Sequence, residues 1–200
     1  MPVSPIILFF DFTSPYSYLA SALVEALAAR HGRSVEWVPV LLGPVFAATG
    51  ARPPSQQPLK AEYMARDLAR SARFLGVTYH HPQPFPVATQ QAARVLLGLQ
   101  RARSPLAVDW IHRVFEAYFV DGQDISAMPV LHTVGRGLRL QPEQIDAWCA
   151  EPELKERLRA NGQRALVAGM CGAPYFVVDD EPFWGVDRLP QIERWLQARF

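Results

Sequence analysis

The first apolar run of the chain, residues 6–12, has the pattern of a strand that is buried on both faces. Apolar residues then recur three and four positions apart, which predicts a helix with one buried side: Tyr16, Leu19, Ala20, Leu23 and Leu27. Ser14 and Pro15 stand where this helix begins, because serine is a preferred N-cap and proline is favoured at the first helical position. Gly32 follows as a C-terminal stop.

A second strand is predicted over residues 35–42. Pro39 lies inside it and indicates an edge position or an early end, because proline removes a donor from the ladder. The chain is then expected to turn over residues 43–50. Residues 51–60 are polar and rich in proline, which is typical of an exposed connection or a lid.

The middle of the chain has the periodicity of helices. The first of them carries its apolar residues on one side and is closed by Gly76: Met64, Leu68, Ala72 and Leu75. Further helices are predicted over residues 87–101, 105–120, 127–134, 142–150 and 152–167. Ser104 is the expected cap of the helix over residues 105–120.

Strand character returns near the C-terminal end. Residues 175–178 and a strand that begins at Phe183 and Trp184 predict a hairpin, and Asp187 is expected to cap a final helix. Neither end of the chain has enough strands for a stable sheet alone, so we expect the two ends to join. The predicted fold class is α/β: one domain formed by residues 1–45 and 168–200, interrupted by an all-helical insertion domain, residues 46–167.

Composition limits the kind of partner. Two hundred residues, half of them apolar, suit one globular domain or one domain with a large insertion. The 20 basic and 19 acidic residues leave no strong field that would attract nucleic acid or an anionic membrane, so a small-molecule partner is expected. Two cysteines indicate a reducing compartment, and the N-terminal apolar run is too short for a signal peptide or a membrane span. We therefore expect a cytoplasmic protein.

Ser14 is the first candidate for chemistry. The free backbone N–H groups and the dipole at a helix N-terminus attract anions, including thiolates. A hydroxyl placed there can also donate a hydrogen bond to a thiolate that a cofactor brings in. The alternative is that Ser14 only caps its helix, and the residues of this segment leave both roles open.

Two segments of the chain resemble a known family. FFDFTSPYSYLA at residues 9–20 and GAPYFVVDDEPFWGVDRL at residues 172–189 are similar to 2-hydroxychromene-2-carboxylate isomerases and kappa-class glutathione transferases, which belong to the DsbA-like branch of the thioredoxin fold. The resemblance extends over essentially the whole chain, including LGPVFAATG and LKAEYMARDLAR. It implies a thioredoxin-like domain interrupted by the helical domain, a homodimer, and glutathione bound between the two domains with its sulfur at Ser14.

The resemblance also assigns individual residues. Residues 14–17 occupy the place of the two cysteines of redox relatives, and because hydroxyls cannot form a disulfide, this motif cannot carry out disulfide exchange. Ser14 is instead the implied catalytic residue, stabilising the thiolate of glutathione. Ala173 and Pro174 match a loop that ends in a cis-proline, where the backbone of Ala173 pairs with the cysteinyl part of glutathione.

Four further residues complete the implied glutathione site. Asp187 and Arg188 match the pair that holds the γ-glutamyl end, the carboxylate on its ammonium and the guanidinium on its carboxylate. Tyr16 and Val186 belong to the same two motifs. The chain departs from the family at Val186, where a polar residue is frequent, and at Ala51, where an asparagine that contacts glutathione is common.

Other candidates have less support. Phe46, Phe85 and Lys60 are candidates for a pocket that takes an aromatic substrate with a carboxylate, although aromatic residues more often belong to the core and lysines to the solvated surface. His80 and His81 have no partner at metal-ligand spacing, so no metal site is expected.

The sequence thus predicts a glutathione-dependent cis-trans isomerase of an aromatic-degradation intermediate, 2-hydroxychromene-2-carboxylate or a relative. In this reaction the thiolate adds to an unsaturated carbon, the resulting single bond rotates, and elimination gives the trans product, trans-o-hydroxybenzylidenepyruvate, and regenerates glutathione. One alternative is a kappa-like transferase or peroxidase that uses the same site. Another is a thioredoxin-fold binding module without catalysis.

Overall fold

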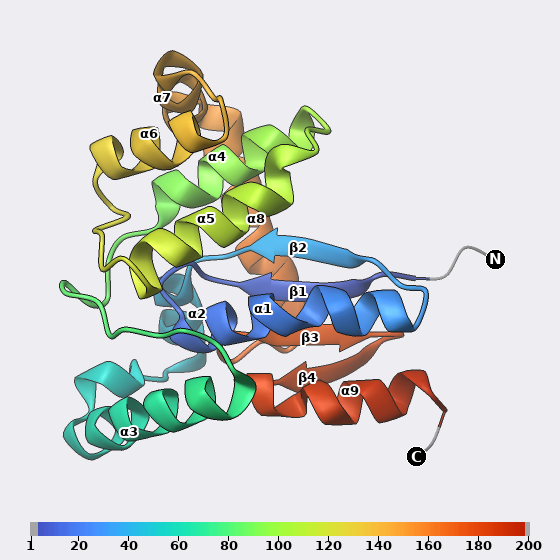
Figure 1. Ribbon diagram of the computed structural model, residues 1–200. Coiled ribbons are helices and arrows are strands. Elements are labelled where there is room, and N and C mark those ends of the chain that lie inside the picture. Colours follow the sequence, from blue (N-terminus) through green and yellow to red (C-terminus); the bar gives the residue numbers. More distant parts are fainter. Residues whose placement is uncertain (1–3, 199–200) are drawn as a thin grey trace.

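The sheet has four strands at the centre of the molecule, seen in a computed structural model that describes residues 4–198 (Figure 1). The strands are β1 (Ile6–Phe10), β2 (Val35–Pro39), β3 (Tyr175–Val178) and β4 (Glu181–Trp184). Their order across the sheet is β2-β1-β3-β4; β2 is parallel to β1, and the other two pairings are antiparallel. The two ends of the chain therefore join in one sheet, as predicted.

Helices cover both faces of this sheet. The near face in Figure 1 carries α1 (Pro15–Arg30) and α9 (Leu189–Leu196). The far face carries α2 (Leu42–Thr49) and α8 (Pro152–Val167). Since side chains alternate along a strand, β1 serves both sides: Leu8 and Phe10 pack with residues of α1 and α9, while Phe9 packs with Val45 of α2 and Ala165 of α8. The prediction of a strand buried on both faces is confirmed.

Between β2 and β3 the chain is helical, as predicted. Besides α2 and α8, the helices of this part are α3 (Pro58–Leu75), α4 (Gln90–Arg101), α5 (Leu106–Phe119), α6 (Met128–Gly137) and α7 (Pro142–Ala150), together with a short 3₁₀ turn, Pro54–Gln56. In Figure 1, α4 to α7 lie above β2, whereas α3 lies on the opposite side beside the start of α1. The fold class predicted from the sequence is confirmed.

The segment after β2 differs from the prediction. The second strand ends at Pro39, at the edge of the sheet, instead of at residue 42, and the expected turn over residues 43–50 is the helix α2. The backbone N–H of Leu42 donates to the Asp11 carboxylate at 2.7 Å, which holds the first turn of α2 in place. Pro44 is tolerated there because N–H groups in the first turn of a helix have no partner within the helix.

Three smaller boundaries also change. The helix predicted over residues 87–101 begins at Gln90, and α6 continues beyond residue 134 to Gly137. Pro105, not Ser104, is the N-cap of α5, although the Ser104 hydroxyl accepts a hydrogen bond from Leu106 N at 3.2 Å. Helix ends fray, and their first and last residues commonly vary by one or two positions.

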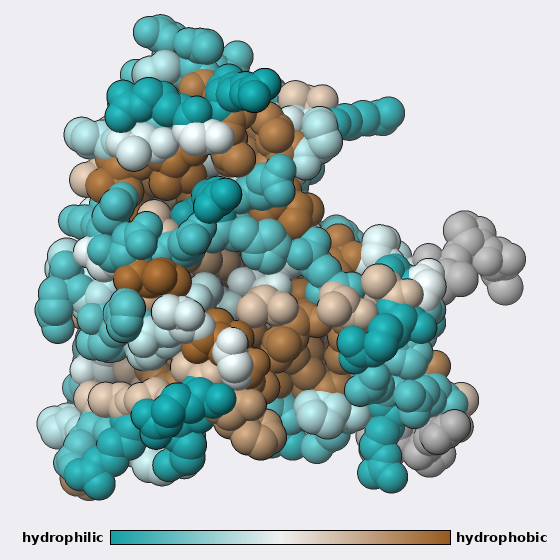
Figure 2. Space-filling model, in the orientation of Figure 1, coloured by the Kyte–Doolittle hydropathy of each residue, from teal (hydrophilic) through white to brown (hydrophobic). Residues whose placement is uncertain are grey.

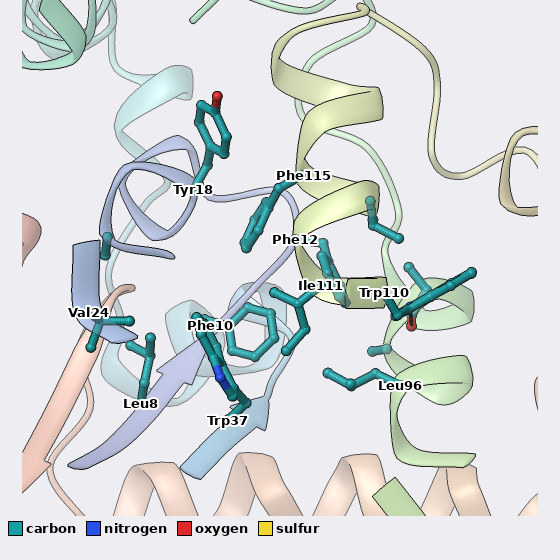
Figure 3. Close-up of a cluster of buried hydrophobic side chains, with 14 of the residues drawn as sticks. Leu8, Phe10, Phe12, Tyr18, Val24, Trp37, Leu96, Trp110, Ile111 and Phe115 are labelled. Atoms are coloured by element: carbon teal, nitrogen blue, oxygen red, sulfur yellow. Dashed lines mark hydrogen bonds between the residues drawn. The ribbon is translucent and has the colours of Figure 1, made fainter. Parts of the chain in front are cut away.

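One aromatic cluster joins the sheet to the helices above it (Figure 3). Phe10 lies between Trp37 of β2 and Phe115 of α5, with ring centroids 5.5 and 5.8 Å apart respectively. Phe12 follows, 5.2 Å from Phe115, and all of these side chains are buried. The core is thus shared between the two parts of the chain that the sequence analysis separates, and the division into two domains stays a prediction.

The surface of the molecule is mostly hydrophilic. On the face seen in Figure 2, hydrophilic residues cover most of the outer surface of the helices, and hydrophobic residues show mainly in the recesses between them. Within residues 4–198, no helix combines the length and the apolar character that crossing a membrane requires.

Candidate active site

Ser14 caps α1. Its backbone is extended (φ −86°, ψ 112°), its side-chain oxygen accepts a hydrogen bond from Ser17 N at 3.2 Å, and Pro15 occupies the first helical position. These are the features of an N-cap followed by a proline, so the predicted start of the helix is confirmed. Because Ser14 is the N-cap, its hydroxyl lies at the positive end of the helix dipole. The residue is 4% exposed and lines a cavity.

The loop before β3 lies opposite Ser14. The Ser14 hydroxyl donates a hydrogen bond to the carbonyl oxygen of Ala173 at 3.1 Å. The peptide bond between Ala173 and Pro174 is cis, as the resemblance implies. The Pro174 carbonyl accepts a hydrogen bond from Gly185 N at 3.0 Å, which joins this loop to the segment that follows β4.

A cavity of about 880 Å³ opens in front of Ser14. Most of the residues proposed from the sequence line it: Ser14, Tyr16, Phe46, Phe85, Ala173, Val186, Asp187 and Arg188. Its volume is in the range of small-molecule sites. Two proposed residues are not among the described residues that line it: Pro174, which follows Ala173 through the cis peptide bond, and Lys60, which is exposed on α3.

Asp187 and Arg188 lie on a 3₁₀ turn, Val186–Arg188, at the rim of this cavity. The guanidinium of Arg188 donates to the Asp187 carboxylate at 2.8 Å, and the two side chains are 41% and 67% exposed. The expectation that Asp187 caps the last helix is wrong, because α9 has Arg188 as N-cap and no side-chain cap. Gly185 makes room for the pair: at its φ of +110°, an added Cβ would lie 2.3 Å from Asp187 Oδ1.

Tyr16 is held by α3. Its hydroxyl donates to Asp67 at 2.8 Å, and Asp67 also accepts from Arg70 at 2.5 Å. Burial, together with the hydrogen bond to Asp67 and its charge, raises the pKa of Tyr16 well above its ordinary value. Tyr16 therefore stays protonated, with its proton directed at Asp67, and it forms part of the cavity wall.

Asp11 is a site residue that sequence reasoning missed. It is 3% exposed, lines the cavity, and its carboxylate accepts hydrogen bonds from Thr13 N at 3.1 Å, Leu42 N at 2.7 Å and Thr89 Oγ1 at 2.6 Å. Burial raises the pKa of Asp11, although the three hydrogen bonds act in the opposite direction. The signal was present in the sequence, since an acidic residue interrupts the apolar run of residues 6–12.

Three further residues line the cavity that the sequence pattern does not predict to lie there. Tyr63 and Met64 of α3 and Trp184 of β4 line the cavity. Periodicity predicted the helix and the strand, but it does not say which loop or helix packs over Ser14. Cys171 is not among the described lining residues, and burial raises the pKa of its thiol, so the thiol form is favoured at this position.

Comparison with known proteins agrees with this geometry. A family model, the DSBA-like thioredoxin domain, matches residues 5–197. The chain belongs to this family. Residues 14–17 contain no cysteine, and the two cysteines of the chain, Cys149 and Cys171, are free and lie elsewhere in the sequence.

The relatives of this DSBA-like protein are the enzymes that its motifs indicated. It is 29% identical to the 2-hydroxychromene-2-carboxylate isomerase of Pseudomonas putida over 190 residues, covering 92% of this chain and 90% of the relative. It is 30% identical to glutathione S-transferase kappa 1 of Caenorhabditis elegans over 214 residues, covering 98% and 93%. The resemblance inferred from the two terminal motifs is confirmed.

Solved structures show the same fold. A 2-hydroxychromene-2-carboxylate isomerase structure superposes with a TM-score of 0.86 at 23% identity, covering 96% of this chain and 94% of the other. The cytosolic disulfide reductase DsbM of Pseudomonas aeruginosa, in a structure with GSH, superposes with a TM-score of 0.68 at 21% identity, covering 98% and 96%. The homodimer and the cytoplasmic location expected from the sequence stay predictions.

Proposed function

We propose that this protein is a glutathione-dependent cis-trans isomerase of an aromatic-degradation intermediate, 2-hydroxychromene-2-carboxylate or a close relative. One observation carries the proposal: the Ser14 hydroxyl lies at the N-terminus of α1, on the wall of a cavity of about 880 Å³, opposite the backbone of Ala173. The family and the named relatives favour glutathione as the source of the sulfur.

Ser14 would act by redirecting one proton. In the structure, the hydroxyl donates to the Ala173 carbonyl and accepts from Ser17 N. If the hydroxyl rotated toward the cavity, it would donate its hydrogen bond to a thiolate instead. The backbone N–H of Ser17 would continue to donate a hydrogen bond to the Ser14 oxygen. The Ala173 carbonyl would then be available to an N–H of the tripeptide, in the manner of an added strand.

The energies involved are sufficient. A cysteine thiol has a pKa near about 8.5, so only a few per cent is ionised at neutral pH. One hydrogen bond to a charged group contributes about 1.5–3 kcal/mol and a helix N-terminus about 0.3–1 kcal/mol more. Because one pKa unit corresponds to about 1.4 kcal/mol, the pKa of the bound thiol would fall by roughly one to three units. Thiolate would then be a major species at neutral pH.

Asp187 and Arg188 would anchor the other end of glutathione. Both side chains are partly exposed at the rim, and their charges match the ammonium and the carboxylate of the γ-glutamyl group. Asp187 and Arg188 at present neutralise each other at 2.8 Å. A zwitterionic ligand can bind to such a pair without leaving either charge alone.

The reaction needs no other cofactor. The hemiketal ring of 2-hydroxychromene-2-carboxylate first opens: its ring C–O bond breaks, the hydroxyl proton passes to the phenolic oxygen, and a ketone conjugated to the cis double bond results. The thiolate then forms a C–S bond to the carbon of that double bond remote from the ketone, and the π electrons move onto the ketone oxygen. The remaining carbon–carbon single bond rotates. The electrons then return, the C–S bond breaks, and the trans isomer leaves with glutathione unchanged. Aromatic residues of the cavity, Phe46 and Phe85, would pack against the ring of the substrate.

The test is glutathione-dependent turnover. Purified protein is incubated with glutathione and either 2-hydroxychromene-2-carboxylate or cis-benzylideneacetone, an uncharged cis-enone, and trans product is measured by chromatography. We expect trans product from at least one of them, only when glutathione is present, and with no net consumption of glutathione. Absence of glutathione-dependent trans product from both compounds would refute the proposal.

A second candidate uses the same thiolate. Identity of 30% to a kappa-class transferase over 98% of the chain favours conjugation as the alternative outcome. In that reaction the C–S bond persists. Accumulation of a stable glutathione conjugate, in place of trans isomer, would select the transferase.

A further inference from the structure

Three segments of the cavity wall meet at the carboxylate of Asp11. Its Oδ1 accepts hydrogen bonds from Thr13 N at 3.1 Å and from Thr89 Oγ1 at 2.6 Å. Its Oδ2 accepts a hydrogen bond from Leu42 N at 2.7 Å. An ionised carboxyl group only accepts hydrogen bonds, so it suits a position that three donors face. All four residues line the cavity.

Two of these segments carry residues of the proposed site. Thr13 directly precedes Ser14, the proposed donor to the sulfur. Thr89 follows Phe85 in the segment before α4, and Phe85 is proposed to pack against the ring of the substrate. Because Asp11 is 3% exposed, water does not readily replace the hydrogen bonds that hold these segments.

The third segment is α2, which this bond holds at its start. The N-cap residue, Leu41, makes no side-chain hydrogen bond to the helix. Of the eight residues of α2, all of which the structure describes, Val45 is the one that is buried. Leu42 is the first residue of α2, and Phe46, about one turn later, lines the cavity. The bond from Leu42 N to Asp11 thus joins the aromatic wall at Phe46 to the end of β1.

We propose that Asp11 is a positioning residue for the electrophile: through the N–H of Leu42 it holds α2 where Phe46 packs against the aromatic ring beyond the sulfur. The inference rests on the proposed function, since that function places the ring against Phe46. Asp11 acts here through α2 and not on the reacting atoms. If the bond is lost, the N–H of Leu42 has no acceptor, and α2 shifts until water or another group accepts from it.

Binding of S-benzylglutathione measures the position of this wall without turnover. The compound carries a phenyl ring on its sulfur, and glutathione is the same ligand without the ring. Calorimetry gives the dissociation constant of each, and we call their ratio the gain from the ring. We expect the unmodified protein to bind S-benzylglutathione at least about tenfold more tightly than glutathione, because the ring is buried against aromatic side chains.

A pair of variants at Leu42 tests the N–H alone. Leu42→Pro removes the N–H, whereas Leu42→Ala removes the side chain and keeps the N–H. Proline is favoured at the first position of a helix, and Leu41 has the extended backbone (φ −110°, ψ 123°) that a residue before proline prefers, so α2 should still form. We expect the gain from the ring to fall below about twofold in Leu42→Pro and to stay above about fivefold in Leu42→Ala. The dissociation constant of glutathione itself should change by less than about threefold in both variants.

Asp11→Asn tests the acceptor. An amide has one oxygen, and turning it toward Thr13 and Thr89 keeps two hydrogen bonds, so its NH₂ group then faces Leu42 N. We expect the same loss of the gain from the ring as in Leu42→Pro. In a Phe46→Ala background, Asp11→Asn should lower the gain by less than about twofold further, because Asp11 acts through Phe46. A general loss of stability would not depend on Phe46 in this way.

The outcomes separate this inference from the proposed function. An unchanged gain from the ring in Leu42→Pro or Asp11→Asn overturns the inference, and so does an equal loss in Leu42→Pro and Leu42→Ala. The full effect of Asp11→Asn in the Phe46→Ala background, or the absence of any gain in the unmodified protein, overturns it as well. The isomerase proposal is in each case still decided by its turnover test. If Asp11→Asn does not fold, the two Leu42 variants decide. Failure of the unmodified protein to bind either ligand overturns both proposals.

Discussion

The Ser14 hydroxyl and the Ala173 carbonyl are joined by a hydrogen bond of 3.1 Å between residues 159 positions apart in the chain. One partner begins a helix and the other precedes a strand, so the site forms where the two ends of the chain meet. In the proposed function, both the hydroxyl proton and the carbonyl lone pair of this bond would instead hydrogen-bond to glutathione. Binding of glutathione would thus exchange one internal hydrogen bond for two with the ligand.

Ser14→Ala removes the proposed donor to the sulfur. We expect the pKa of the bound glutathione thiol to rise by about one to two units, because a hydrogen bond to a charged group is worth about 1.5–3 kcal/mol. The ultraviolet absorbance of the thiolate, titrated against pH, measures it. Ser17→Ala is the matched control, since the buried Ser17 hydroxyl has no hydrogen-bond partner among the described residues. An unchanged pKa in Ser14→Ala would remove Ser14 from the mechanism.

Arg188→Met and Asp187→Asn test the anchoring pair. Each is expected to weaken glutathione binding by about 10- to 100-fold while leaving turnover at saturating glutathione nearly unchanged, because in the proposed function the pair contacts the end of the tripeptide remote from the sulfur. Calorimetry and steady-state kinetics give the two quantities. Arg194→Met, an exposed arginine on α9, is the control and should bind normally. Loss of turnover without loss of affinity would contradict the assignment.

Asp11→Asn tests the buried carboxyl through pH. Because burial raises the pKa of Asp11 above 3.8, the folded protein holds this proton more tightly than the unfolded chain does. The contribution of Asp11 to the free energy of unfolding therefore falls as pH rises from about 4 through the raised pKa. Urea denaturation measures the free energy of unfolding of the original protein and of Asp11→Asn. The difference between the two should narrow or reverse as pH rises. Parallel curves would mean that Asp11 is not perturbed.

Gly98→Ala tests the packing of α4 on α7. An added Cβ would lie 2.5 Å from ring atoms of Trp148, which is buried. We expect a net loss of about 1–2 kcal/mol in the free energy of unfolding, since overpacking costs about 1–3 kcal/mol and the better helix propensity of alanine returns up to about 1 kcal/mol. Gly162→Ala in α8, where nothing lies within 4 Å, should gain about 0.5–1 kcal/mol. Equal effects in the two variants would contradict the close contact.

Much of this structure follows from local sequence. The apolar run before Ser14, the proline after it and the stripe from Tyr16 to Leu27 are enough to predict β1, α1 and the boundary between them. The predicted limits of α7 and α8 agree with the structure because a proline starts each helix and fixes its first turn. The motif at residues 172–189 then supplies the loop that faces Ser14.

The rest depends on contacts that no local pattern contains. The local pattern predicts a turn where α2 lies. The start of α2 is held by Asp11, 31 positions earlier in the chain, and a contact over that separation leaves no local signal. Aspartate is a preferred cap residue, but here the backbone continues from a 3₁₀ turn directly into α9. The Asp187 carboxylate accepts a hydrogen bond from Arg188 instead of capping the helix. Lys60 shows the same limit: composition predicts an exposed connection over residues 51–60, whereas Lys60 lies in the first turn of α3 and is not among the described residues that line the cavity.

The long separation of Ser14 from Ala173 has a consequence for biosynthesis. A ribosome that has translated the chain as far as Val167 has synthesised β1, β2 and every helix from α1 to α8, yet β1 still lacks the neighbour that β3 provides on its other edge. Such non-local pairing forms slowly and leaves an open edge meanwhile. Activity would therefore appear only when the last segment leaves the exit tunnel, and fragments ending before Gly172 should remain inert whatever helices they contain.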